Sequence, residues 1–222
     1  MTEPAAGVRR READARVALG AALAYVALAP LAARDPKSWE QRVFHAVNGT
    51  GGSLPPLRVP QQLGTPWLMP AMAIAGFVTH RPQLVVSAGL ALPLEKGLEV
   101  GTKKITQRRR PAQLIDPELH DDAPTDGPSY PSGHAAIAAC AAALALPYLP
   151  AYAAFPLAVS VGLTTYTRVH QGAHFPVDGI GGVLMGVGAG SLLNYVFGLP
   201  VTGGGSRGRN AALSAASRFK VG

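Results

Sequence analysis

The apolar stretches of this chain constrain its fold most strongly, because they are long enough to cross a membrane. A transmembrane helix needs about 20 apolar residues to span a hydrocarbon core roughly 30 Å thick. Only 15% of the residues are charged, whereas soluble domains average about 25%. The sequence therefore predicts an all-α fold, a six-transmembrane-helix bundle with its active site at one membrane face. Its apolar runs cover about 17–33, 62–80, 83–102, 132–149, 151–167 and 177–198.

The domain organisation follows from these runs. We expect a polar N-terminal tail at 1–16, one integral membrane domain at 17–200 and a flexible C-terminal tail at 201–222. The first run has no clear small-residue cleavage site after it, so it is interpreted as a retained helix rather than a signal peptide.

The third apolar run is unusual because charges lie in or near its end, at Glu95, Lys96 and Glu99. Charges inside a membrane are costly unless they face the bundle interior or an aqueous cavity. The run therefore either lines such a cavity, or ends near Leu94 and leaves these side chains at the interface. Both interpretations stay open at this stage.

The net charge of +7 does not indicate nucleic-acid binding. The basic residues lie between apolar runs instead of forming a continuous stripe with interleaved aromatic residues. That placement fits lipid headgroups or a phosphorylated substrate. The single cysteine, Cys140, lies inside an apolar run and excludes an intramolecular disulfide.

Three clusters of candidate catalytic and binding residues lie in or beside the third and fifth loops of the predicted bundle. In a six-helix bundle these two loops emerge on the same side, so we expect all three clusters on one membrane face. In the first cluster, Lys103 and Arg110 are seven residues apart and would share a helix face. Pro111 then disfavours further helix. A plain headgroup-binding flank is the alternative interpretation. Second-rank candidates for holding an anionic headgroup are Lys104, Arg108 and Arg109.

The second cluster, Ser132-Gly133-His134, directly precedes an apolar helix. Free backbone N–H groups and the helix dipole favour an anion at such a position, so phosphate could be held against Ser132 and Gly133. Ser132 could instead be a simple N-cap. His134 could likewise be an ordinary interfacial histidine.

The third cluster contains Arg168, His174 and Asp178. Pro176 fits the first position of the sixth helix, which leaves His174 just before that helix and Asp178 in its first turn. An aspartate that accepts a hydrogen bond from one imidazole nitrogen fixes the tautomer and frees the other nitrogen to attack. His170 and His174 could alternatively ligate a metal, but no third ligand has convincing spacing. We therefore expect no metal and no cofactor.

These three ordered motifs resemble the signature of the type 2 phosphatidic acid phosphatase superfamily, which also contains vanadium haloperoxidases and bacterial acid phosphatases. Two positions depart from the family pattern: Thr167 stands where a serine is usual, and His170 where an aromatic residue is frequent. Both Thr and Ser offer a hydroxyl. The resemblance rests on Lys103-(six residues)-Arg110-Pro111, Pro131-Ser132-Gly133-His134 and Arg168-(five residues)-His174-(three residues)-Asp178.

The resemblance implies an all-helical bundle with a phosphohistidine mechanism. In that mechanism His174 attacks phosphorus, Asp178 stabilises the resulting imidazolium, and His134 protonates the leaving oxygen and then activates water. The groups implied to hold the phosphoryl oxygens are Lys103, Ser132, the Gly133 N–H, Arg110 and Arg168.

The substrate is expected to be a membrane lipid phosphate of the polyprenyl phosphate, polyprenyl diphosphate or phosphatidate type, hydrolysed without a metal. A lipid phosphotransferase with an alcohol acceptor would share every motif. A non-enzymatic membrane binder or transporter would explain the helices but not the two histidines and the aspartate. The Ala-, Gly- and Arg-rich composition hints at a bacterial cell membrane. Lysine and arginine are almost evenly divided between the two sides, so the outward-facing active site follows from the resemblance.

Overall fold

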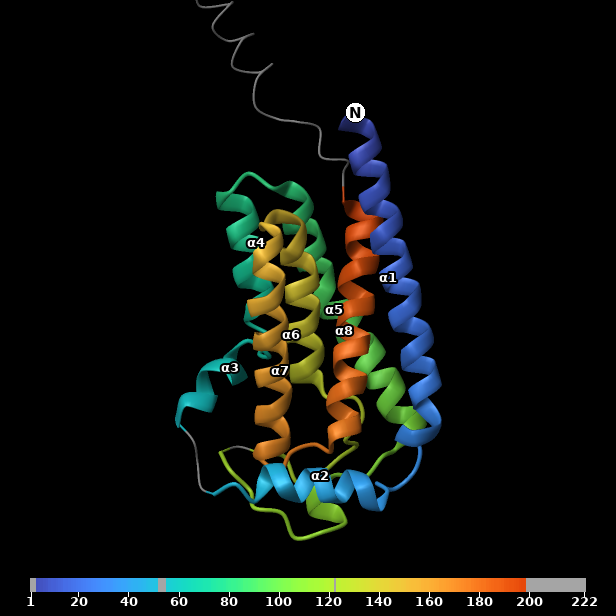
Figure 1. The fold of residues 1–222 in the computed structure, drawn as a ribbon, viewed down its shortest axis with the longest axis vertical. Helices are drawn as coiled ribbons and strands as arrows, with labels where there is room; N and C mark the ends of the chain where they lie inside the picture. The colour runs from blue at the N-terminus through green and yellow to red at the C-terminus, as the bar shows by residue number, and fades with distance from the viewer. Residues whose placement is uncertain (1–2, 52–54, 122, 199–222) are drawn as a thin grey trace, which may run out of the picture.

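The computed structural model describes residues 3–51, 55–121 and 123–198, and all the regular secondary structure in this part of the chain is helical. Its longer helices run side by side as a bundle (Figure 1). A helix occurs within each of the six predicted apolar runs, which agrees with the all-α prediction. These six are α1 (Glu3–Ala32), α4 (Leu68–Val78), α5 (Pro82–Thr106), α6 (Gly133–Ala145), α7 (Ala154–His170) and α8 (Pro176–Phe197).

Two of these helices have the length and hydropathy expected of a membrane span: Arg10–Ala32 within α1, and α8. α4 is apolar but short, because 11 residues extend only about 16 Å at 1.5 Å per residue. The segment Gly133–Tyr148 is also apolar but shorter than a standard span. Six of the eight α-helices in the described residues thus lie in the predicted apolar runs. That these six each cross a membrane stays a prediction.

The expected boundaries need three corrections. Residues 3–16, predicted as a polar tail, belong to α1. The predicted run 62–80 is interrupted, because the short helix α3 (Arg58–Gln62) is followed by turns and α4 begins only at Leu68. The third run does not end near Leu94, since α5 continues to Thr106. The predicted tail 201–222 lies outside the described residues.

Two arginines near the beginning of α1 anchor that helix to the bundle. Arg10 Nη1 donates to the carbonyl of Pro147 at 3.0 Å, and Arg11 Nε donates to the carbonyl of Gly198 at 2.8 Å. Both carbonyls belong to segments that follow apolar helices, where helix-end oxygens lack intrahelical partners. These bonds connect the beginning of α1 to the segments that follow α6 and α8.

The tight contact between α6 and α8 depends on small residues. A Cβ atom at Gly186 would lie 2.1 Å from the carbonyl oxygen of Ala136, and one at Gly190 would lie 2.8 Å from Cβ of Ala143. In lipid, helices associate through such close backbone approach rather than through the hydrophobic effect. The free thiol Cys140 is buried in the same region. This packing fixes the relative positions of the beginnings of α6 and α8.

A helix that the apolar runs did not reveal, α2 (Ser38–Asn48), lies across the loop end of the bundle (Figure 1). Its Phe44 packs against Phe175 with a ring-centroid distance of 5.2 Å. On the same helix Glu40 is only 3% exposed. α2 therefore covers the loops that precede α6 and α8. The remaining short 3₁₀ helices are Pro55–Leu57, Pro111–Gln113, Leu146–Tyr148 and Ala151–Ala153.

Candidate active site

A polar cavity of about 210 Å³ is located where α5 ends and α6 and α8 begin. Two apolar hollows of about 610 and 480 Å³ are larger, but neither is lined by a predicted site residue. The polar cavity is therefore the place for chemistry. Its lining contains four cations and one carboxylate: Gly64, Pro66, Lys96, Glu99, Lys103, Arg110, Pro124, Gly133, His134, Ile137, Arg168 and His174.

His174 lies in the loop between α7 and α8 and is 3% exposed. Its Nε2 atom is 3.5 Å from Arg110 Nη1. Because arginine only donates hydrogen bonds, this contact favours the tautomer in which Nε2 is unprotonated and Nδ1 carries the proton. Burial, reinforced by Arg110, lowers the pKa of His174 to about 4 against the opposing effect of Asp178. The imidazole of His174 is thus neutral at physiological pH.

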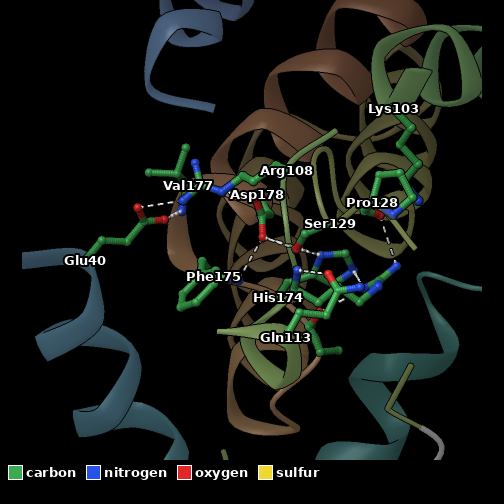
Figure 2. Close-up of polar contacts among 12 residues, drawn as sticks. Glu40, Lys103, Arg108, Gln113, Pro128, Ser129, His174, Phe175, Val177 and Asp178 are labelled. Carbon is green, nitrogen blue, oxygen red and sulfur yellow. Dashed lines mark hydrogen bonds and ion pairs between the residues drawn. The ribbon is translucent and has the colours of Figure 1, made fainter. Parts of the chain in front are cut away.

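Ser129 sits between His174 and Asp178 (Figure 2). The Nδ1 atom of His174 is 3.4 Å from Ser129 Oγ and 3.7 Å from Asp178 Oδ2, and Ser129 Oγ donates to the same Oδ2. A separation of 3.7 Å is too long for a hydrogen bond. The expected direct His174–Asp178 contact is therefore replaced by a serine-assisted one. Nothing in the motif spacing singled out Ser129.

Asp178 is fully buried in the first turn of α8. Its Oδ2 accepts the backbone N–H of Phe175 at 2.8 Å, which closes the beginning of the helix. Its Oδ1 forms an ion pair with Arg108 Nε at 3.1 Å. A carboxylate at a helix N-terminus is also stabilised by the helix dipole. Asp178 is thereby held as an anion behind Ser129 and His174.

Arg108 and Glu40 complete this buried network, and sequence reasoning assigned neither of them to it. Arg108 Nη2 donates to Glu40 Oε2 at 2.7 Å, and Glu40 Oε1 accepts the backbone N–H of Val177 at 3.0 Å. Burial raises the pKa of Glu40, and Arg108 opposes that shift. The second-rank prediction that Arg108 holds a headgroup is wrong, because its guanidinium is buried against two carboxylates.

The two other second-rank candidates differ from Arg108. Arg109 forms an exposed ion pair with Asp35, with 2.5 Å between Nη2 and Oδ2. Lys104 is exposed and does not line the cavity. The basic residues between 103 and 110 thus have three different environments. Lys103 and Arg110 line the cavity, Arg108 is buried, and Lys104 and Arg109 lie on the surface.

The three predicted phosphate-binding cations all line the cavity. Arg110 is oriented by the carbonyls of Asp126 and Ala173, each at 2.8 Å. Arg168 Nη1 donates to Gln171 Oε1 at 2.6 Å, while its buried Nε has no hydrogen-bond partner among the described residues. Lys103 Nζ is 2.6 Å from Glu99 Oε1. These anchored positive groups form a preorganised site for an anion.

The Ser132-Gly133-His134 cluster is divided by the structure. Gly133 and His134 line the cavity, whereas Ser132 does not and is fully buried. The Ser132 hydroxyl makes no capping bond and has no hydrogen-bond partner within the described residues. Its backbone N–H donates to the carbonyl of Asp178 at 2.9 Å. Ser132 therefore occupies the N-cap position of α6 without a side-chain capping bond, and contact between Ser132 and phosphate stays a prediction.

His170, for which the sequence offered no role, is packed between α2 and the loop after α5. Its ring stacks on His120 at 5.1 Å, and its carbonyl accepts a hydrogen bond from Asn48 at 2.8 Å. It does not line the cavity. Across residues 3–51, 55–121 and 123–198, no three His, Cys, Asp or Glu side chains come together as metal ligands would.

Residues 83–199 match the model of the PAP2 superfamily, and this segment is more than half of the chain. An undecaprenyl-diphosphatase of Sulfolobus acidocaldarius is 36% identical over 104 residues, covering 46% of this chain and 48% of that protein. The chain thus matches about half the length of this curated relative.

Two solved structures are similar in fold. The crystal structure of Aquifex aeolicus LpxE has a TM-score of 0.64 and 24% identity, covering 71% of this chain and 95% of that one. The first transmembrane PAP2 type phosphatidylglycerolphosphate phosphatase from Bacillus subtilis has a TM-score of 0.61 and 23% identity, covering 80% and 94%. Since the segment matched by the family model contains all three motifs that meet at the cavity, the chain belongs to the PAP2 superfamily.

Proposed function

We propose that this protein is a membrane lipid phosphatase that works through a phosphohistidine intermediate on His174. The observation that supports it most is that Nε2 of His174 faces Arg110 at 3.5 Å, in a cavity that also contains His134 and three further predicted phosphate ligands, Lys103, Gly133 and Arg168. A neutral imidazole oriented from behind by an anion is a competent nucleophile. A set of fixed cations stabilises the charge that develops on the phosphoryl group.

In the first step, His174 Nε2 forms a bond to phosphorus while the bond from phosphorus to the leaving oxygen breaks. His134 donates a proton to that oxygen, and Asp178 stabilises the imidazolium of His174. In the second step His134 removes a proton from water, the resulting hydroxide attacks phosphorus, and the N–P bond breaks. Inorganic phosphate is released and His174 is restored.

The proposed substrate is a phosphomonoester or diphosphate of a membrane lipid, of the polyprenyl or phosphatidate type. Two features support a lipid: the cavity opens at one end of a bundle of apolar helices, and the similar proteins carry names of enzymes for undecaprenyl diphosphate and phosphatidylglycerol phosphate. If a lipid alcohol instead of water attacked the phosphohistidine intermediate, the protein would be a phosphotransferase. Identifying the product, inorganic phosphate or a new phosphate ester, distinguishes the phosphatase from the phosphotransferase.

Replacing each of the two histidines is expected to impair a different step of the reaction. His174→Ala should abolish turnover and leave no trapped phosphoenzyme, because it removes the attacking nitrogen. His134→Ala should slow cleavage of a lipid phosphomonoester by roughly 10²–10⁴-fold, yet form phosphoenzyme readily from an activated aryl phosphate, whose leaving group needs little protonation. The measurement is quenched trapping of acid-labile, base-stable phosphate on each variant.

His45→Ala is the matched control, since His45 is exposed on α2 and does not line the cavity. It should behave as the unmodified protein does. Acid-labile phosphate on the His174→Ala variant would show that the nucleophile has been misassigned.

Ser129 is proposed to be a positioning residue that keeps His174 in the required tautomer. Ser129→Ala should lower kcat by roughly 10–100-fold, as loss of an orienting partner does at other reactive side chains, with KM and the inhibition constant of inorganic phosphate changed less than about threefold. Asp178→Asn should be more damaging, approaching about 10⁴-fold. Ser160→Ala, which removes a hydroxyl bonded only to the carbonyl of Pro156, is the control. A parallel loss of phosphate affinity in Ser129→Ala would indicate a general structural defect instead.

Metal independence is proposed because Lys103, Arg110 and Arg168 supply the positive charge that a metal would otherwise provide. Phosphate release should therefore persist in excess chelator, at a rate within about twofold of that without it. Complete loss of activity that one added divalent ion restores would overturn this part of the proposal.

The orientation we propose has the cavity on the outer side of a bacterial cell membrane. Leu119 is exposed in the loop before α6, and His80 is exposed at the α4–α5 turn near the opposite end of the bundle (Figure 1). In intact cells, a membrane-impermeant thiol reagent should label Leu119→Cys and not His80→Cys, while the natural Cys140 is buried. Labelling at position 80 alone would reverse the orientation.

A further inference from the structure

One cation of the cavity, Lys96, belongs to none of the three motifs. Its Nζ atom is 2.6 Å from Glu99 Oε2, and Lys103 Nζ is 2.6 Å from Glu99 Oε1. Two ammonium groups therefore share one carboxylate, and all three side chains line the same cavity. Neutralising Glu99 requires a single cation, so Lys96 is an additional positive charge at the site.

Lys96 lies at the part of the cavity that is nearer the middle of the bundle. It precedes Lys103 by seven residues on α5, which is two helical turns or about 10 Å along the axis. On the other wall, Ile137 is one turn further into α6 than His134. The cavity thus extends from the His174 end, between α5 and α6, toward the interior of the apolar bundle. A lipid tail would leave the site in that direction.

The environment of Lys96 is suited to binding a ligand. Its side chain is 47% exposed, whereas that of Glu99 is 10% exposed. A lysine ammonium has three N–H donors, and the contact with Glu99 uses one of them. Charged side chains within apolar helices are generally retained for a functional reason. A half-exposed ammonium in this cavity is available to a second anionic group of the substrate.

We propose that Lys96 binds the phosphoryl group that stays with the lipid when a lipid diphosphate is cleaved, which makes a diphosphate the preferred substrate. This inference rests on the proposed phosphatase function. The terminal phosphoryl group lies against His174, Arg110 and Arg168, and the lipid-linked one lies near Lys96.

The chemistry of the leaving group explains the preference. As the His174 Nε2–phosphorus bond forms, the bond from the terminal phosphorus to the bridging oxygen breaks and its electron pair goes to that oxygen. The leaving lipid monophosphate gains negative charge, which the Lys96 ammonium stabilises. With a lipid monophosphate as substrate, the leaving oxygen belongs to an alcohol that has no further phosphoryl oxygens. Lys96 then has nothing to bind at that position.

The alternative is that Lys96 only neutralises Glu99 and so holds Lys103 in place. The two roles differ in how they depend on the substrate. Loss of a charge that orients Lys103 would impair every phosphorylated substrate equally, whereas loss of a ligand for the second phosphoryl group would impair diphosphates alone.

The experiment compares farnesyl diphosphate with farnesyl monophosphate, which share one tail, in detergent micelles. Unmodified protein should have the higher kcat/KM on the diphosphate. Lys96→Met should lower kcat/KM for the diphosphate by roughly 10–100-fold, the usual effect of losing a charge-assisted hydrogen bond, and change that for the monophosphate less than about threefold. Lys96→Arg should retain the preference, because it keeps the positive charge.

Two matched variants serve as controls. Lys103→Met should impair both substrates, and Lys37→Met, at an exposed position before α2, should impair neither. Preserved monophosphate turnover also demonstrates that the Lys96→Met protein is folded.

Equal losses on both substrates, or no loss on the diphosphate, would overturn the assignment of Lys96. Failure of the unmodified protein to release inorganic phosphate from either substrate would instead refute the phosphatase function itself. The two failures are therefore distinguishable in a single set of assays.

Discussion

Asp178 carries a buried negative charge, and the arrangement of the site depends on how that charge is compensated. Arg108 bridges Asp178 and Glu40 with N–O distances of 3.1 and 2.7 Å, and both carboxylates also accept backbone N–H groups at the beginning of α8. Breaking a buried ion pair by removing one partner costs about 3–5 kcal/mol, because it leaves an unpaired charge in a low-dielectric interior. The network therefore joins α2, the segment after α5 and α8 as one unit (Figures 1 and 2).

The orientation of His174, the proposed nucleophile, follows from that unit. Asp178 holds Ser129, and Ser129 lies against Nδ1 of His174, so that Nε2 is left facing Arg110 and the cavity. The position of His134 across the cavity depends on a different constraint, the close α6–α8 contact that Gly186 permits. Two separate features of the fold, one polar and one built on small residues, thus position the two histidines of the proposed mechanism.

The cavity concentrates positive charge among partly buried side chains. Lys96, Lys103, Arg110 and Arg168 outnumber the single carboxylate of Glu99. Fixed charges in such surroundings act more strongly on a developing anion than they do in water. The same surroundings make each uncompensated cation costly, which favours binding of a dianionic or more highly charged phosphoryl substrate. Membership of the PAP2 superfamily agrees with this electrostatic character.

Much of the site could be predicted from the sequence. Lys103, Arg110, Arg168, His134 and His174 were expected at one end of a helical bundle, and all five line one cavity. These predictions were possible because helix ends, proline positions and motif spacings are local properties of the chain. The positions of the apolar helices were predictable for the same reason, since the length of an apolar run is a local property.

Only the tertiary structure decided which groups support that site. Glu40 lies 137 residues before Val177, the residue whose N–H it accepts, and it belongs to a helix too polar to appear as an apolar run. Nothing in the local sequence distinguishes Ser129 and Arg108 from the other serines and arginines of the chain. Their contacts with Asp178 form only when the loop before α6 folds against the first turn of α8. Local sequence therefore determined the residues of the proposed site and the helices. Long-range compensation of buried charge, which no local pattern encodes, determined how those residues are oriented.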